Sequence, residues 1–211
     1  MDPHEHWQRI YTTRHSTQVG WYEPDPTTSR RLIAAAVTDG AASVIDIGGG
    51  ASLLVDRLLD AGVPRVAVLD ISEAGLDAAR QRLGERADGV EWIVGDVTTL
   101  GTVGTFDVWH DRAVFHFLLD AEARARYVAL SERTVGQGGH AIMATFAADG
   151  PERCSGLPVV RFGPHDLERE CGPGWRLCTS ERHLHTTPGG MGQWFTYGTF
   201  RRTVGDPASA R

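Results

Sequence analysis

The feature that most constrains this chain is the stretch 44–52, where an apolar run carrying Asp46 is followed by three consecutive glycines. A helix-compatible segment begins shortly after them, at Ser52. This pattern predicts a buried strand that turns sharply into a helix. Because Gly48, Gly49 and Gly50 have no Cβ, their backbone N–H groups can come close to a bound ligand.

A second acid, Asp70, follows Gly50 by twenty residues and ends another apolar run, 65–69. In a doubly wound α/β sheet, an acid at the tip of the second strand can accept hydrogen bonds from the hydroxyls of a ribose. A glycine turn combined with a ribose-binding acid predicts a cofactor that contains a nucleoside.

The glycine spacing indicates which nucleoside cofactor to expect. A dinucleotide fingerprint, G-x-G-x-x-G, needs a third glycine at the position where this chain has Leu53. A phosphate-binding P-loop is excluded because no Gly-Lys-Ser/Thr follows. The remaining ligand has a nucleoside but no phosphates, and S-adenosylmethionine fits that description.

Five segments, taken in order, resemble the class I S-adenosylmethionine-dependent methyltransferases. They are motif I at 44–52, the motif II acid Asp70, the adenine-flanking segment 95–97, the motif IV strand 106–111 and the turn 136–139. The resemblance extends from about residue 7 to residue 203 and implies S-adenosylmethionine as cofactor, with S-adenosylhomocysteine as product. The residues expected to bind it are Trp7, Tyr11, Asp46, Gly48, Gly49, Gly50, Asp70, Ile71, Asp96, Val97 and His110.

Strand and helix patterns alternate along the chain, which predicts a parallel sheet with helices on both faces. Expected strands cover 43–48, 65–70, 90–95, 105–110 and 139–146, and expected helices cover 27–38, 51–61, 73–83, 121–134 and 165–171. Two aromatic-bearing stretches, 175–187 and 193–203, predict an antiparallel hairpin at the sheet edge. The family layout implies an α/β, Rossmann-like, doubly wound sheet of seven strands, mostly parallel, with an antiparallel C-terminal strand.

The 211 residues predict one domain, 1–211. We expect an N-terminal cap at 1–30, a Rossmann-like core at 31–204 and a frayed tail at 205–211. The apolar content of 41% is ordinary for a globular protein, and no apolar run reaches the roughly 20 residues of a membrane span.

The net charge and the cysteines of the chain indicate which kinds of partner and which location to expect. The net charge of −6 argues against a nucleic-acid partner, and the polar, acidic first residues are unlike a secretory signal. Three cysteines without a Cys-x-x-Cys pair predict neither a disulfide framework nor a metal site. We therefore expect a cytoplasmic monomer or homodimer that acts on a small molecule, with no nucleic acid, membrane or metal partner.

The N-terminal cap carries two aromatic pairs. Trp7 and Tyr11 are four residues apart and therefore share a helix face, and Trp21 and Tyr22 follow after a polar gap. They either hold the cap on the core or form a lid, because aromatic faces attract a cation such as a sulfonium. The arrangement resembles the caps of thiopurine-type S-methyltransferases and of elongation-factor lysine methyltransferases, which have different acceptors.

The end of the fourth strand is the other informative region, because ligands bind beyond the carboxyl ends of such strands. We consider His116 as a general base and Asp111 as a second catalytic candidate, since an acceptor that arrives protonated needs a base. Alternatively, His116 packs in a short helix and bonds a backbone group, and Asp111 pairs with Arg112. The expected acceptor-binding residues are Trp21, Tyr22, Arg112, Phe115 and Cys154.

The function we predict is methyl transfer from S-adenosylmethionine to a small, uncharged or soft nucleophile, whose reacting sulfur, oxygen or nitrogen stays open. One alternative is a protein lysine methyltransferase. Another is a noncatalytic cofactor-binding or regulatory protein. His183 and His185, two apart on an expected strand, are interpreted as surface residues rather than a metal site.

Overall fold

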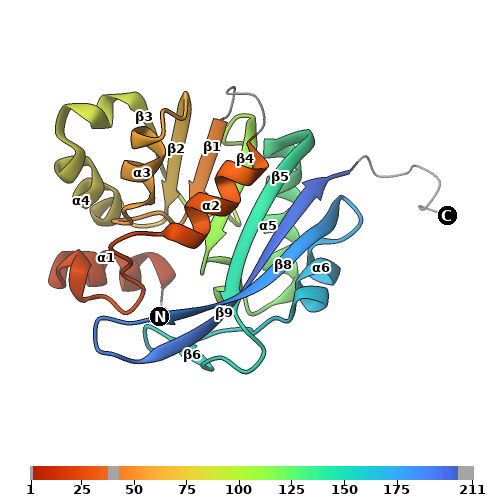
Figure 1. Ribbon diagram of the computed structural model, residues 1–211. Helices are drawn as coiled ribbons and strands as arrows, with labels where there is room; N and C mark the ends of the chain where they lie inside the picture. Colours follow the sequence, from red (N-terminus) through yellow and green to blue (C-terminus); the bar gives the residue numbers. More distant parts are fainter. Residues whose placement is uncertain (1, 38–42, 204–211) are drawn as a thin grey trace.

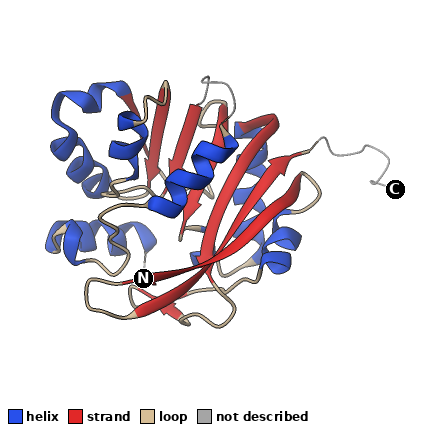
Figure 2. Ribbon diagram, in the orientation of Figure 1, coloured by secondary structure: helices blue, strands red, loops and turns tan. Residues whose placement is uncertain are grey.

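The computed structural model describes residues 2–37 and 43–203, and Figure 1 shows a central twisted sheet flanked by helices. The helices are α1 (Pro3–Thr13), α2 (Thr27–Ala36), α3 (Leu54–Asp60), α4 (Glu73–Leu83), α5 (Ala121–Thr134) and α6 (Pro164–Cys171). Short 3-10 turns lie at η1 (Ser16–Gln18), η2 (Gly84–Gly89) and η3 (Phe115–Phe117). Figure 2 separates helices from strands.

The main sheet has seven strands in the order β3-β2-β1-β4-β5-β9-β8. They are β1 (Ser43–Ile47), β2 (Arg65–Asp70), β3 (Val90–Val94), β4 (Phe106–Arg112), β5 (Val135–Phe146), β8 (Trp175–Thr186) and β9 (Gly192–Arg202). All neighbours from β3 to β5 pair in parallel, whereas β9 runs antiparallel to both β5 and β8. The predicted Rossmann-like sheet with an antiparallel last strand is therefore confirmed.

The strand β1 shows why both faces of the sheet carry helices. Its alternate side chains enter two separate clusters, with Val44 on one face and Ile45 on the other. The cluster of Val44 receives side chains from α2, α3 and α4, and that of Ile45 receives side chains from α5 and α6. Such a doubly covered parallel sheet directs its ligand sites to the carboxyl ends of its strands.

Several boundaries differ from the predictions. The helix predicted at 51–61 begins only at Leu54, because the glycine turn continues through Ser52. β4 and β5 are longer than predicted, and residues 149–158 contain a small hairpin of β6 (Arg153–Cys154) and β7 (Leu157–Pro158) that the sequence did not indicate. α2 ends at Ala36 and begins after Pro26 rather than after a threonine cap, and the predicted tail 205–211 lies outside the described residues.

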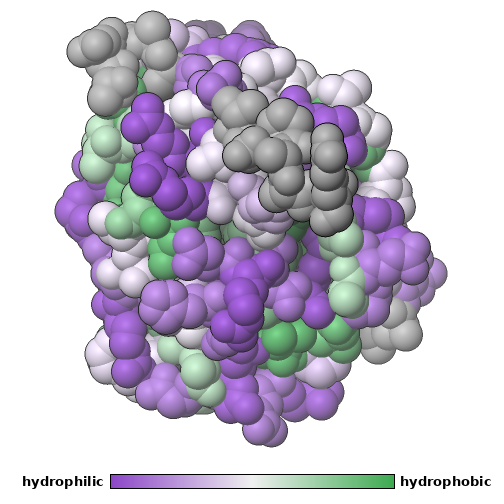
Figure 3. Space-filling model, turned by 90° about the vertical axis from the view of Figure 1, so that its right-hand side faces the viewer, coloured by the Kyte–Doolittle hydropathy of each residue, from purple (hydrophilic) through white to green (hydrophobic). Residues whose placement is uncertain are grey.

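The surface beyond the β8 edge is mostly hydrophilic, with small hydrophobic areas between the polar ones (Figure 3). None of the helices in the described part of the chain has both the length and the apolarity needed to cross a bilayer.

A buried polar network beneath β4 is expected to contribute measurably to stability. The Tyr127 hydroxyl donates to Asp111 Oδ2 at 2.5 Å and accepts from Trp109 Nε1 at 2.7 Å. Tyr127→Phe removes a donor from a buried carboxylate, so we expect a loss of about 1–3 kcal/mol in the free energy of unfolding, measured with urea. Tyr22→Phe, at a half-buried position, is the control and should change stability by less than about 0.5 kcal/mol. Equal effects of the two substitutions would contradict this account.

Candidate functional site

A cavity of about 460 Å³ lies at the carboxyl ends of the parallel strands and is also lined by the cap helix α1. The strand ends and the loops after them supply Gly48, Asp70, Ile71, Asp96, Val97 and Arg112, and the cap supplies Trp7, Tyr11 and Trp21. Sequence reasoning predicted these residues for the site, and the structure brings them around one space. A smaller cavity of about 50 Å³ adjoins it, since both are lined by Tyr11, Trp21, Ile47, Gly48 and Arg112.

The glycine turn after β1 is shaped by the cap as well as by any ligand. Gly48 and Gly50 have φ of 68° and 43°, values that favour glycine. A Cβ on Gly50 would lie 2.4 Å from the Tyr11 hydroxyl oxygen and 2.9 Å from Asp70 Oδ2. Gly50 lines neither cavity, and in the described structure its missing side chain makes room for Tyr11; the approach of its backbone to a cofactor stays a prediction.

Asp70, at the end of β2, is a buried carboxylate that lines the larger cavity. Its Oδ1 accepts a hydrogen bond from the Ser72 backbone N–H at 2.7 Å. Burial raises the pKa of Asp70 to about 7, with the nearby Asp46 adding to the increase and backbone N–H groups opposing it. A half-neutralised acid of this kind suits a ligand that offers hydroxyl donors, because such donors favour the ionised form.

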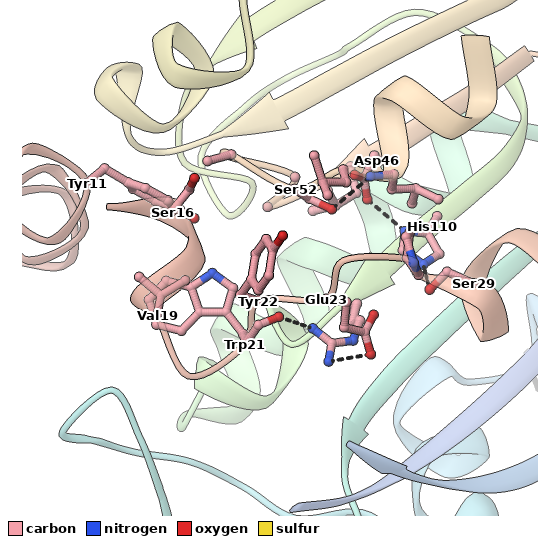
Figure 4. A pocket seen from close by; sticks show the side chains of 18 residues that line it. Tyr11, Ser16, Val19, Trp21, Tyr22, Glu23, Ser29, Asp46, Ser52 and His110 are labelled. Atoms are coloured by element: carbon pink, nitrogen blue, oxygen red, sulfur yellow. Dashed lines mark hydrogen bonds and ion pairs between the residues drawn. The ribbon is translucent and has the colours of Figure 1, made fainter. Parts of the chain in front are cut away.

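The smaller cavity is lined by a chain of three buried polar side chains, which Figure 4 shows at close range. His110 Nδ1 lies 2.7 Å from Asp46 Oδ1, and its Nε2 lies 2.9 Å from Ser29 Oγ. With Nδ1 donating to the carboxylate of Asp46, Nε2 of a neutral ring accepts from the Ser29 hydroxyl. The lone pairs of Ser29 Oγ and Asp46 Oδ2 then provide acceptor positions at this cavity.

The loop between α1 and α2 is attached to the core through Glu23. Arg112 Nη2 donates to Glu23 Oε1 at 3.0 Å and Arg112 Nη1 donates to the Trp21 carbonyl at 3.1 Å (Figure 4). His185 Nε2 donates to the Gly20 carbonyl at 2.7 Å. Burial acts to raise the pKa of Glu23, but the hydrogen bond from His185 and the charge of Arg112 outweigh it and lower the pKa. Buried His185 is therefore a cap contact, not the surface residue predicted.

The helix α1 itself is docked rather than free. Gln8 Oε1 accepts hydrogen bonds from the Ser72 hydroxyl at 2.8 Å and from the Ala74 backbone N–H at 3.2 Å, at the start of α4. On the cavity side, the ring of Trp7 meets those of Trp21 and Phe117 edge to face, with centroids 5.4 and 5.2 Å away. The cap is therefore packed on the core, and its aromatic side chains also line the cavity; its action as a lid over a bound cofactor stays a prediction.

Three residues predicted for catalysis or acceptor binding do not line either cavity. Asp111 is fully buried, and its carboxylate accepts from the backbone N–H groups of Val114 and Phe115 and from Tyr127. Phe115 is buried against Tyr127, a position that corrects its expected contact with the acceptor.

His116 is also fully buried, and its Nδ1 accepts from the Phe146 backbone N–H at 3.3 Å. Burial, with the charge of Arg112 adding to it, lowers its pKa to about 3. Because this imidazole lies away from both cavities, it is poorly placed to take a proton from an acceptor. Its position matches the alternative in which His116 packs in a short helix and bonds a backbone group.

The remaining acceptor candidates do reach the site. Arg112 and Trp21 line both cavities, Tyr22 lines the smaller one and Cys154 the larger one. Burial raises the pKa of the Cys154 thiol to about 12, although Arg112 acts in the opposite direction. Within the described residues, no group of three or more histidine, cysteine or acidic side chains is arranged to hold a metal ion.

Comparison with known proteins places this site in context. Residues 44–139 match the family model of a methyltransferase domain, and no curated protein sequence matches the chain. A solved structure of a protein from echinomycin biosynthesis, reported for conversion of a disulfide bond into a thioacetal group, covers 99% of this chain and 95% of its own, with TM-score 0.75 and 18% identity.

Two further structures have the same fold. The N-methyltransferase NodS of Bradyrhizobium japonicum, in complex with S-adenosylhomocysteine, covers 96% of this chain and 100% of its own, with TM-score 0.72 and 15% identity. A methyltransferase from Anabaena variabilis covers 96% of both chains, with TM-score 0.70 and 15% identity. Residues 44–139 thus match a methyltransferase domain, and the chain shares its fold with these two S-adenosylmethionine-dependent methyltransferases.

Proposed function

We propose that this enzyme transfers a methyl group from S-adenosylmethionine to a small-molecule soft nucleophile, such as a thiol, that binds beneath the cap. The observation that carries the proposal is the composition of the larger cavity. Its lining includes aromatic rings and three aspartates but no histidine, and each of these aspartates accepts a hydrogen bond from a nearby backbone N–H, as described above for Asp70. Asp96 accepts from the Thr98 N–H and Asp120 accepts from the Ala123 N–H.

The residues around the cavities fit the cofactor. The buried carboxylate of Asp70 suits the ribose hydroxyls, and Ile71, Asp96 and Val97 form an adjoining wall for the adenine. The acceptor atoms of Asp46 and Ser29 at the smaller cavity suit the ammonium of the amino-acid end. When bound, the cofactor supplies an electrophilic methyl carbon whose bond to the sulfonium sulfur breaks as the acceptor forms its own bond to carbon.

For the acceptor, the chain contributes mainly enclosure and alignment. Trp7, Trp21 and Phe117 form an apolar wall that excludes water, and Cys154 lies in the same lining. A thiol can reach the site as its thiolate, which needs no base on the enzyme. A hydroxyl or a lysine ammonium needs one, and a positioned base contributes on the order of 10²–10⁴-fold in rate. This difference favours a soft nucleophile over the lysine alternative.

The structural neighbours leave the acceptor atom open. One was studied for chemistry at a disulfide and another is named an N-methyltransferase, and each is less than 20% identical to this chain. The proposal for sulfur therefore rests on the cavity of this chain and not on its neighbours.

The first prediction from the proposed function concerns pH and cofactor affinity. If ribose hydroxyls bind the ionised form of Asp70, protonation competes with binding, so affinity should fall below about pH 7, by roughly tenfold per pH unit. Asp70→Asn should abolish this slope and weaken binding about 10- to 150-fold at pH 8, measured by calorimetry with S-adenosylhomocysteine. Asp77→Asn, on the exposed side of α4, is the control and should keep both slope and affinity. A flat wild-type profile would rule out this role.

The same raised pKa predicts the stability of the ligand-free protein. A carboxyl group whose pKa rises on folding stabilises the fold at low pH and loses that contribution as pH rises toward its folded value. Between about pH 4 and 7, the ligand-free wild type should therefore lose stability relative to Asp70→Asn. Urea denaturation at several pH values measures this difference, and parallel pH profiles would contradict it.

The second prediction concerns the smaller cavity. His110→Phe leaves Asp46 without its hydrogen-bond donor, so binding of S-adenosylhomocysteine should weaken by about tenfold or more. Binding of 5′-methylthioadenosine, which lacks the amino-acid end, should stay within about threefold. Ser29→Ala retains the Asp46–His110 pair and should have a smaller effect. Equal losses for both ligands would place the amino-acid end elsewhere.

The third prediction tests the proposed reaction. With radiolabelled cofactor, thiophenol should be methylated and phenol should not, and the rate should follow ionisation of the thiol. His116→Asn, which keeps an acceptor for the Phe146 N–H, should retain turnover within about threefold. A loss of a hundredfold or more at unchanged cofactor affinity, with a pH limb near the imidazole pKa, would identify His116 as the base and refute the proposal.

A further inference from the structure

Residues 19–23, which we call the wall segment, contribute to both cavities of the site. Trp21 lines the two cavities, and the smaller one is also lined by Val19, Tyr22 and Glu23. The ring of Trp21 meets those of Trp7 and Tyr11 edge to face, with centroids 5.4 and 6.2 Å away. Because the wall segment connects η1 with α2 and lies outside both, its position depends on the contacts that it makes with the rest of the protein.

Two side chains of the central sheet hold the wall segment by its backbone. From β8, His185 Nε2 donates to the Gly20 carbonyl at 2.7 Å. From β4, Arg112 Nη1 donates to the Trp21 carbonyl at 3.1 Å (Figure 4). Glu23 adds a third attachment, because its Oε1 lies 3.0 Å from Arg112 Nη2 and 3.5 Å from His185 Nδ1. Both peptide groups that flank Trp21 are therefore held by the sheet.

The two donors are themselves supported by one aromatic ring. His185 is only 3% exposed, and its ring meets that of Phe195, on β9, edge to face with centroids 6.2 Å apart. The guanidinium carbon of Arg112 lies 4.8 Å from the centroid of the same Phe195 ring. The spacing of the two donors is therefore set by packing within the sheet and not by the segment that they hold, which is what precise positioning of a site residue requires.

A neighbouring histidine differs from His185 in its contacts. His183 lies two positions earlier on the same face of β8, and its Nε2 is 3.8 Å from Glu23 Oε1. Its Nδ1 lies 3.1 Å from Thr28 Oγ1, at the start of α2. Both histidines thus face the carboxylate of Glu23, whereas the hydrogen bond to the Gly20 carbonyl comes from His185. His185 is not among the residues that line either cavity of the described structure, so it can act on the site through the wall segment.

We propose that His185 is a positioning residue for the methyl transfer, which holds the Trp21 ring where the two cavities meet. This inference rests on the proposed function, in which the smaller cavity takes the amino-acid end of the cofactor and the larger one takes the acceptor. The methyl group then crosses beside Trp21. A misplacement of about 1 Å in such a site can cost on the order of 10²-fold in rate, so the placement of this ring affects the transfer step.

The first measurement is kcat with thiophenol at saturating S-adenosylmethionine, expressed per folded molecule. His185→Leu removes the donor to the Gly20 carbonyl, so kcat should fall about tenfold or more, while affinity for 5′-methylthioadenosine stays within about threefold. His185→Gln, whose amide can donate to the same carbonyl, and the matched control His183→Leu should both keep kcat within about threefold. A purely structural role would lower the free energy of unfolding of His185→Leu but leave kcat unchanged, and that result overturns the inference.

A double-mutant cycle tests whether His185 acts through Trp21. Trp21→Phe and His185→Leu should each lower kcat. The double variant should be within about threefold of the slower single variant, because holding the segment gives no benefit once the Trp21 ring is gone. Losses that multiply in the double variant would mean that His185 acts by another route, which contradicts the proposal.

A third readout does not depend on the reaction. In protein labelled with 5-fluorotryptophan, the fluorine resonance of Trp21, assigned with Trp21→Phe, should shift in His185→Leu but not in His183→Leu. The resonances of Trp92, on β3, and of Trp175, at the start of β8, should stay in place in both variants. If the wild type methylates no thiol but the Trp21 resonance shifts as expected, the proposed reaction fails and the positioning of Trp21 by His185 stands. An unchanged Trp21 resonance in His185→Leu refutes that positioning.

Discussion

Three buried aspartates at the carboxyl ends of β1, β2 and β4 dominate the physics of this site, because a buried carboxylate must find donors or take up a proton. Asp111 has Tyr127 and two backbone N–H groups, so its needs are met within the fold. Asp46 has the imidazole of His110 on one oxygen. Asp70 has backbone N–H groups only, and burial keeps its pKa near 7. Asp111 is therefore a structural acid, whereas Asp46 and Asp70 can still accept hydrogen bonds from a ligand.

The position of the cap helix α1 depends on the same strand ends. Tyr11 lies over the glycine turn because neither Gly50 nor Gly75 has a side chain, and a Cβ on either would come within 3.0 Å of an atom of Tyr11. Burial, together with the nearby charge of Asp70, raises the pKa of the Tyr11 hydroxyl. A cofactor that satisfies Asp70 therefore changes the surroundings of the cap residue directly above it. We therefore expect cofactor binding to be linked to the position of the cap through this contact.

Much of the fold was predictable because the alternation of apolar strands and helices is a local signal. The glycine turn, Asp70 and the segment 95–97 were found for the same reason, since each lies just after a strand. Boundaries were less predictable, as at Leu54, where the turn delays the helix. The direction of a side chain after a strand end was not predictable at all. Asp111 and His116 lie in the expected region, yet both point into the protein.

The contacts that sequence reasoning missed join segments far apart in the chain. Ser29 meets His110 from 81 positions away, and His185 reaches the carbonyl of Gly20 from 165 positions away. Only the folded sheet, in which β8 lies beyond β9 and α2 crosses near β4 and β5, brings these partners together (Figure 1). The sequence around Glu23 did not indicate its buried contacts, since a single acidic residue before a proline is common in surface turns.

These long-range contacts also explain where acceptor selectivity can arise in a common fold. The glycine turn and the strand-end acids line the proposed cofactor site, whereas the other walls of the larger cavity come from the cap, η3 and the β6–β7 hairpin. All three are short and lie outside the parallel part of the sheet. They can therefore change in sequence without disturbing the strands that hold Asp46 and Asp70. A chain less than 20% identical to its structural neighbours can thus keep their fold while it shapes an acceptor site of its own.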